Sequence, residues 1–130
     1  MMVMERRCGY GDILAAAKGK RVLIWTCNTC ARLCNNLGGD ASASELASRL
    51  KADGVDVIGV LSTSASCLKS KVRSKSESLD AVPELIISMT CDIGARCVRD
   101  VFGTSVFEPF ETLGPGYLDE GGVPRLSDGN

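Results

Sequence analysis

The sequence predicts a small, doubly wound α/β domain of the Rossmann or flavodoxin-like type, with three layers and a four-stranded, mainly parallel sheet. Three short runs rich in β-branched and apolar residues are nearly continuous rather than alternating, as expected for strands covered on both faces. Helical patterns separate these runs, so strand and helix alternate along the chain. A length of 130 residues with 45% hydrophobic content predicts a single domain spanning 1–130.

The strand-like runs are 22–26, 55–62 and 85–90, and their order predicts right-handed crossovers between parallel strands. A fourth run, 106–110, contains Pro109, and proline cannot donate a ladder hydrogen bond. We therefore expect the fourth run at the edge of the sheet or at a strand end.

Helix signals lie between the runs. Ser42 with Glu45 three residues later predicts a capping box, and Gly54 predicts the end of that helix. One helical face after Cys91 carries Ile93, Cys97, Val98, Val101 and Phe102, and Gly103 ends this element. Weaker patterns predict helices at 68–78 and 12–18, the latter within an N-terminal helix and arm at 1–20. Residues 114–130 are rich in glycine and predict a loop-like tail.

Composition narrows the function classes. The formal net charge of −1 gives no general attraction to nucleic acid or to an acidic membrane surface. No apolar stretch has the length of a membrane span and no secretory signal is visible, so we expect a cytoplasmic protein. In that compartment seven cysteines favour metal binding or redox chemistry over disulfides. The absence of histidine excludes imidazole-based catalysis and imidazole metal ligands.

Three cysteines follow the three predicted strands. Cys27 comes directly after the first strand, Cys67 lies shortly after the second and Cys91 comes directly after the third. Because the carboxyl ends of parallel strands meet at one edge of the sheet, where ligands bind in such folds, we expect these thiols to gather there.

The first of these cysteines begins a C-x2-C-x3-C pattern with Cys30 and Cys34. If this stretch is helical, the spacing places all three sulfurs on one face. Gly38 and Gly39 follow, and they would let the backbone turn closely around a bound group.

All-thiolate donors suit an iron–sulfur cluster or zinc. Five candidate cysteines spread over three loops favour a cluster of the four-iron, four-sulfur type, with zinc as the alternative. The candidate metal ligands are Cys27, Cys30, Cys34, Cys67 and Cys91.

Other interpretations of the cysteines stay open. Free cysteine is often a small core hydrophobe, and this is the favoured interpretation for Cys97, while Cys8 is expected to be a loosely held thiol. The same edge of the sheet could also serve a metal-free protein-interaction module. A third interpretation is a thiol enzyme in which Cys91 or Cys27 is the nucleophile, its pKa lowered by a helix N-terminus.

The sequence CNTCARLC at 27–34, the glycine pair after it and the cysteines after the second and third strands resemble the C-terminal-like domain of methylenetetrahydrofolate reductases. That family is best known as the small iron–sulfur subunit of two-subunit enzymes. Asn28 replaces the family's glycine, and Asp92 and Ile93 replace small residues. The resemblance covers about residues 20–122.

The resemblance implies a non-catalytic subunit of an oxidoreductase complex in one-carbon metabolism. Its cluster would transfer electrons to or from a flavin-dependent reductase subunit or another redox protein. A homo-oligomer stays open, and no nucleic-acid or membrane partner is implied.

Overall fold

The computed structural model describes residues 1–127, and a four-stranded parallel sheet forms their centre. The strand order is β3-β2-β4-β5, and every pair in it is parallel. The strands are β2 (Arg21–Cys27), β3 (Asp56–Thr63), β4 (Leu85–Met89) and β5 (Ser105–Phe107). All four predicted strands are confirmed. The last, β5, lies at the edge of the sheet and ends before Pro109, as the proline predicted.

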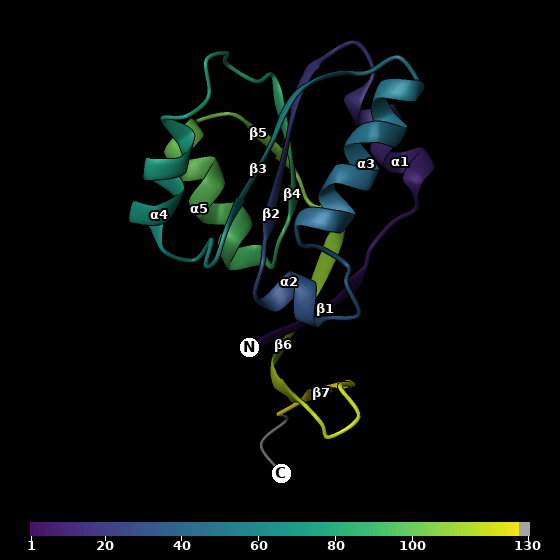
Figure 1. Cartoon of the computed structure of the whole chain (residues 1–130), viewed down its shortest axis with the longest axis vertical. Coiled ribbons are helices and arrows are strands. Elements are labelled where there is room, and N and C mark those ends of the chain that lie inside the picture. The colour runs from purple at the N-terminus through teal and green to yellow at the C-terminus, as the bar shows by residue number, and fades with distance from the viewer. Residues whose placement is uncertain (128–130) are drawn as a thin grey trace.

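Helices cover both faces of this sheet, with α1 and α3 on one side and α4 and α5 on the other (Figure 1). Their bounds are α1 (Tyr10–Ala17), α2 (Cys30–Leu33), α3 (Asp40–Ala52), α4 (Lys69–Ser76) and α5 (Asp92–Phe102). Successive strand side chains point to opposite faces, so Ile24 packs in the core beside α1 and α3 while Trp25 packs in the core beside α4 and α5. The nearly continuous apolar runs in the sequence arise from this double coverage.

The predicted helices are present, with one correction to their signals. Gly103 ends α5 in the left-handed conformation at φ 64°, as predicted. The capping box at Ser42 is wrong, because α3 begins at Asp40 with Gly39 as its N-cap. Ser42 lies inside the helix, and its hydroxyl donates to the carbonyl oxygen of Asn36 at 2.7 Å.

The two ends of the chain form a second sheet that the sequence analysis missed. It contains β1 (Met2–Arg6), β6 (Phe110–Leu118) and β7 (Pro124–Leu126), all antiparallel in the order β1-β6-β7. The prediction of a loop-like tail from residue 114 is therefore wrong for 114–118 and 124–126, while 128–130 lie outside the described residues.

Pro115 does not interrupt β6, because it lies where the strand changes partners. The pairing with β1 ends at Pro115, and the pairing with β7 begins at Gly116. Gly114, at φ 144°, supplies a conformation there that other residues rarely adopt.

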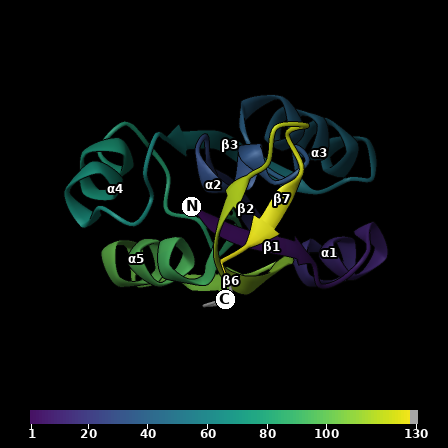
Figure 2. The same cartoon turned by 90° about the horizontal axis from the view of Figure 1, so that it is seen from below.

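Seen from the carboxyl end of the parallel strands, β1 and β6 cross that end of the sheet, close to α2 (Figure 2). Within residues 1–127, no helix combines the length and the apolar character needed to cross a membrane.

Candidate metal centre

The cysteine motif spans the end of a strand and one short helix rather than a single helix. Cys27 is the last residue of β2 and pairs with Thr63 of β3, whereas Cys30 is the first residue of α2. The prediction that all three sulfurs share one helical face is wrong, because the parallel ladder continues through Cys27. Only Cys30 and Cys34 are related by the spacing of a helical turn.

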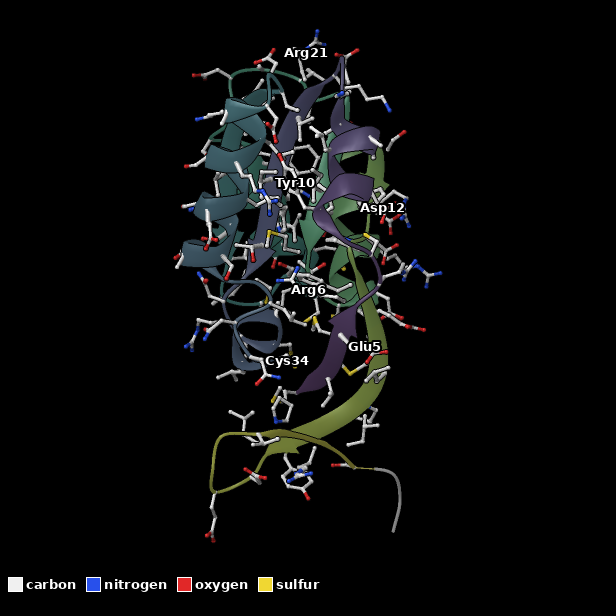
Figure 3. The ribbon with its side chains drawn as sticks, turned by 90° about the vertical axis from the view of Figure 1, so that its right-hand side faces the viewer. Glu5, Arg6, Tyr10, Asp12, Arg21 and Cys34 are labelled. Atoms are coloured by element: carbon white, nitrogen blue, oxygen red, sulfur yellow. The ribbon has the colours of Figure 1, made fainter. Side chains whose placement is uncertain are left out.

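Cys30 and Cys34 both bond the backbone of Met2, the first residue of β1. The N–H of Met2 donates to Sγ of Cys30 at 3.3 Å, and Sγ of Cys34 donates to the carbonyl oxygen of Met2 at 3.5 Å. Cys34 is 1% exposed, and Figure 3 shows it beside β1. The N-terminal strand therefore covers this pair of thiols.

Cys91 belongs to the same group of thiols. It is the N-cap of α5 and is separated from the end of β4 by Thr90. Cys91 belongs to the same core cluster as Cys34, and Cys30 packs against that cluster. Burial raises the pKa of both Cys34 and Cys91, and the charge of Cys30 raises each of them further. Three of the five predicted ligands thus lie in the same part of the core, contributed by the connections after β2 and β4.

The side chain of Cys27 points to the face of the sheet opposite the one that holds Cys34 and Cys91. In β2 it shares the alternation of Leu23 and Trp25, whose side chains lie in the core beside α4 and α5. Its sulfur makes a 3.8 Å hydrogen bond to the carbonyl oxygen of Ser64, in the loop after β3. The structure therefore does not place Cys27 with the other two cysteines of its motif.

Cys67 is also apart from the group of three. It is exposed in the loop before α4, and its carbonyl oxygen accepts a 3.7 Å hydrogen bond from Sγ of Cys97. Cys97 is 6% exposed in the core beside α4 and α5, which confirms its predicted role as a core residue. Cys8 is half-buried at the border of the other core.

Gly38 and Gly39 fit closely against protein atoms. A Cβ atom on Gly38 would lie 2.6 Å from Cβ of Ala31 and 2.9 Å from both the Met89 carbonyl oxygen and Oγ1 of Thr26. Gly39 has φ 96°, and its N–H donates to Oγ1 of Thr26 at 2.7 Å. Close packing between α2, β2 and β4 therefore explains why glycine is needed at 38, and contact with a cofactor at either glycine stays a prediction.

Asn28, which stands where the resembled family has glycine, joins the cysteine loop to α3. Its amide nitrogen donates to Oδ2 of Asp40 at 3.1 Å, and its amide oxygen accepts from the Asp40 N–H at 3.0 Å. Its carbonyl oxygen accepts a 2.8 Å hydrogen bond from Nε of Arg32. These bonds hold the loop between β2 and α2 in place.

The donor set is soft, and burial raises the pKa of Cys34 and Cys91, which favours the protonated form of these two thiols. Thiolate is the metal-binding form, so a cation bound here would displace the thiol protons. In the described part of the chain, no three Cys, Asp or Glu side chains are already arranged to hold one metal ion.

The thiol-enzyme interpretation required a lowered pKa at Cys91. Cys91 does lie at the N-terminus of α5, and the N–H groups of Ile93 and Gly94 favour its thiolate. Desolvation by burial is larger and raises its pKa, so the expected direction is wrong for this residue. A buried thiol with a raised pKa is a poor nucleophile at neutral pH.

The sequence analysis missed Met2, whose backbone polar groups contact both thiols of α2. The apolar residues Met1 to Met4 were the available signal, because a run of this kind can form a covered strand. Comparison with family models, with curated proteins and with solved structures finds no match to this chain.

Proposed function

We propose that this chain is a metal-binding accessory protein that holds an iron–sulfur cluster through cysteine thiolates and transfers electrons to a partner protein. The observation that supports this best is the convergence of Cys30, Cys34 and Cys91 in one core cluster after β2 and β4. Soft thiolate donors of this kind suit iron–sulfur clusters.

The position of the three thiols matches the general rule for ligand binding in open parallel sheets. After β2 the chain crosses to α3 on one face, and after the neighbouring β4 it crosses to α5 on the other (Figure 1). Adjacent strands whose connections diverge in this way leave a crevice at their carboxyl ends, which is the usual ligand site of doubly wound folds. The strand order matches the flavodoxin-like order, so we assign the domain to that Rossmann-like class as part of the proposal.

Cys30, Cys34 and Cys91 would hold the cluster, and the fourth ligand would be Cys27 or Cys67. Cys27 must give up its bond to Ser64 to reach the group, and Cys67 must move in from its exposed loop. A bound cluster would supply one-electron transfer. The Met2 N–H, which donates to Sγ of Cys30, would stabilise negative charge on that sulfur and thereby raise the reduction potential.

Zinc is the second candidate, because cysteine thiolates are also common ligands of zinc. With zinc the site would organise the edge of the sheet without electron transfer. The partner in the leading proposal is a flavin-dependent reductase subunit, an idea that rests on the resemblance of residues 27–34 to the small subunit of methylenetetrahydrofolate reductases.

The test is anaerobic purification of the full chain, followed by reconstitution with iron and sulfide and assays for iron, acid-labile sulfide and zinc. We expect visible absorption from thiolate-ligated iron that is bleached by dithionite. C30S, C34S and C91S should each lose most of the bound iron, whereas the control C8S should retain it. A colourless, iron-free chain that binds zinc, and that loses this zinc in C30S, C34S and C91S, would support the second candidate. A chain that binds neither metal would overturn both.

A further inference from the structure

A cavity of about 350 Å³ lies between α1 and α3, apart from the cysteines. Its size is within the range of small-molecule sites in proteins. The floor is apolar and includes Ile13, Leu37, Met89 and Phe110. Arg6 at the end of β1 and Arg49 on α3 line the same cavity, and Figure 3 shows Tyr10 at the side of α1 toward α3, with Arg6 below it.

The charges at the cavity favour an anion. Arg6 and Arg49 are its two cationic residues, and Glu45 is its one acidic residue. Neither arginine forms an ion pair within residues 1–127. Two guanidinium groups without a carboxylate partner beside an apolar floor are the features expected of a site for an organic anion.

Arg49 is held in place by Tyr10. The guanidinium carbon lies 3.7 Å from the centre of the Tyr10 ring, and the hydroxyl of Tyr10 donates to Oδ2 of Asp53 at 2.5 Å. A guanidinium group held over the face of an aromatic ring can still direct N–H groups to a carboxylate. This wall of the cavity is therefore organised before any ligand arrives.

The cavity also carries neutral polar groups on the loop between α2 and α3. Asn35 and Asn36 both adopt left-handed backbone conformations, at φ 53° and φ 55°, and Asn36 lines the cavity. The carbonyl oxygen of Asn36 accepts the Ser42 hydroxyl, which fixes the loop against α3. Two consecutive non-glycine residues in this conformation are costly, and such strain is commonly found at ligand sites.

From these observations we infer that the cavity binds a small organic anion, with the carboxylate on Arg6 and Arg49 and an aromatic or aliphatic body on the apolar floor. This site is independent of the proposed metal centre, since none of the cysteines lines it. Arg6 and Arg49 select for the negative charge, and the floor of Met89 and Phe110 selects for the apolar body.

The experiment titrates the full chain with 2-naphthoate and, separately, with its neutral analogue 2-naphthamide, and follows backbone amide resonances by NMR. We expect naphthoate to shift amides on α1, α3 and the Asn36 loop, and to bind at least about tenfold more tightly than naphthamide, as for a charge-assisted contact. R6Q and R49Q should each weaken naphthoate binding by a similar factor. E45Q should strengthen it, because the one acidic group at the cavity is removed.

R73Q is the matched control, because Arg73 is an exposed arginine on α4, on the opposite face of the sheet. It should bind naphthoate as the unmodified chain does. R49Q also removes the contact with the Tyr10 ring and could disturb the native structure. In that case R6Q alone tests whether the cavity binds the anion. Equal binding of the acid and the amide, shifts located outside this cavity, or no binding of either compound would overturn the proposal. The metal assays above can succeed or fail without affecting this result.

Discussion

Sγ of Cys34 donates a hydrogen bond to the carbonyl oxygen of Met2 across 3.5 Å. Thirty-two residues separate the two partners, and the N–H of the same Met2 donates to Sγ of Cys30. The strand at the start of the chain thus shields the proposed ligands, and access to them depends on whether β1 stays in place.

Removal of residues 1–4 should uncover Cys34, which is only 1% exposed in the intact chain. We expect its alkylation by iodoacetamide at neutral pH to become at least about tenfold faster, because a buried thiol reacts only when its surroundings open. Mass spectrometry of tryptic peptides would measure the rate. Cys97, in the core on the other face of the sheet, should stay protected, and its simultaneous labelling would mean that the truncated chain has unfolded.

The replacement G38A should destabilise the protein by about 1–3 kcal/mol, since the added methyl group would overlap Ala31 and two oxygen atoms. Urea denaturation monitored by the fluorescence of Trp25, the single tryptophan, would measure the free energy of unfolding. G11A is the matched control. Apart from its chain neighbours and the backbone of its own helix, no atom lies within 4 Å of that Cβ position in α1, so we expect a gain of up to about 1 kcal/mol. Equal effects at the two positions would contradict the packing argument.

Stability should fall in alkaline solution. Burial raises the pKa of Cys34 and of Cys91 in the folded chain, whereas an unfolded thiol ionises near pH 8.5. Their contribution to stability is therefore complete below about pH 8.5 and is lost as the pH rises through the folded values. Urea midpoints between pH 7 and pH 10 should decrease, and the decrease should be smaller in the double variant C34A/C91A. An identical pH dependence in both proteins would show that other groups cause it.

Trp25 and Ser66 should be energetically coupled. Nε1 of Trp25 donates to Oγ of Ser66 at 3.0 Å in a buried environment, and that hydroxyl also bonds Oγ1 of Thr63. A double-mutant cycle of W25F and S66A should give a coupling energy of about 1 kcal/mol, the usual net value of a buried hydrogen bond. Trp25 also makes an edge-to-face contact with Phe102, at 5.7 Å between ring centres. W25F alters this contact equally with and without S66A, so it should cancel from the coupling energy. Additive effects of the two substitutions would indicate that the bond contributes nothing.

The parts of the fold that sequence predicted well depend on local signals. The five residues of β4 are all buried and were recognisable as one apolar run, and Gly103 marked the end of α5. The pairing of β1 with β6 joins segments more than 100 residues apart, and nothing near Met2 indicates its partner. Gly114 and Pro115 suggested a loop because both residues are typical of turns. They are accommodated in β6 where its pairing passes from β1 to β7, and this pairing depends on the tertiary structure.

The candidate site shows the same limit. Sequence placed Cys91 after its strand, and the structure agrees. The sequence did not show that β2 extends to Cys27. Successive side chains of a strand lie on opposite faces of the sheet, so the position of Cys27 within the strand decides the face on which its sulfur lies. Cys27 therefore points away from Cys30 and Cys34, although the three are neighbours in one short motif.

The dependence of β1 on β6 has a consequence for the order of events during synthesis. Within residues 1–127, β1 pairs with β6 alone, and β6 follows it by more than 100 residues in the chain. Until the ribosome has produced β6, β1 has no strand to join. The thiols of α2 consequently remain open to a metal donor until β6 has emerged.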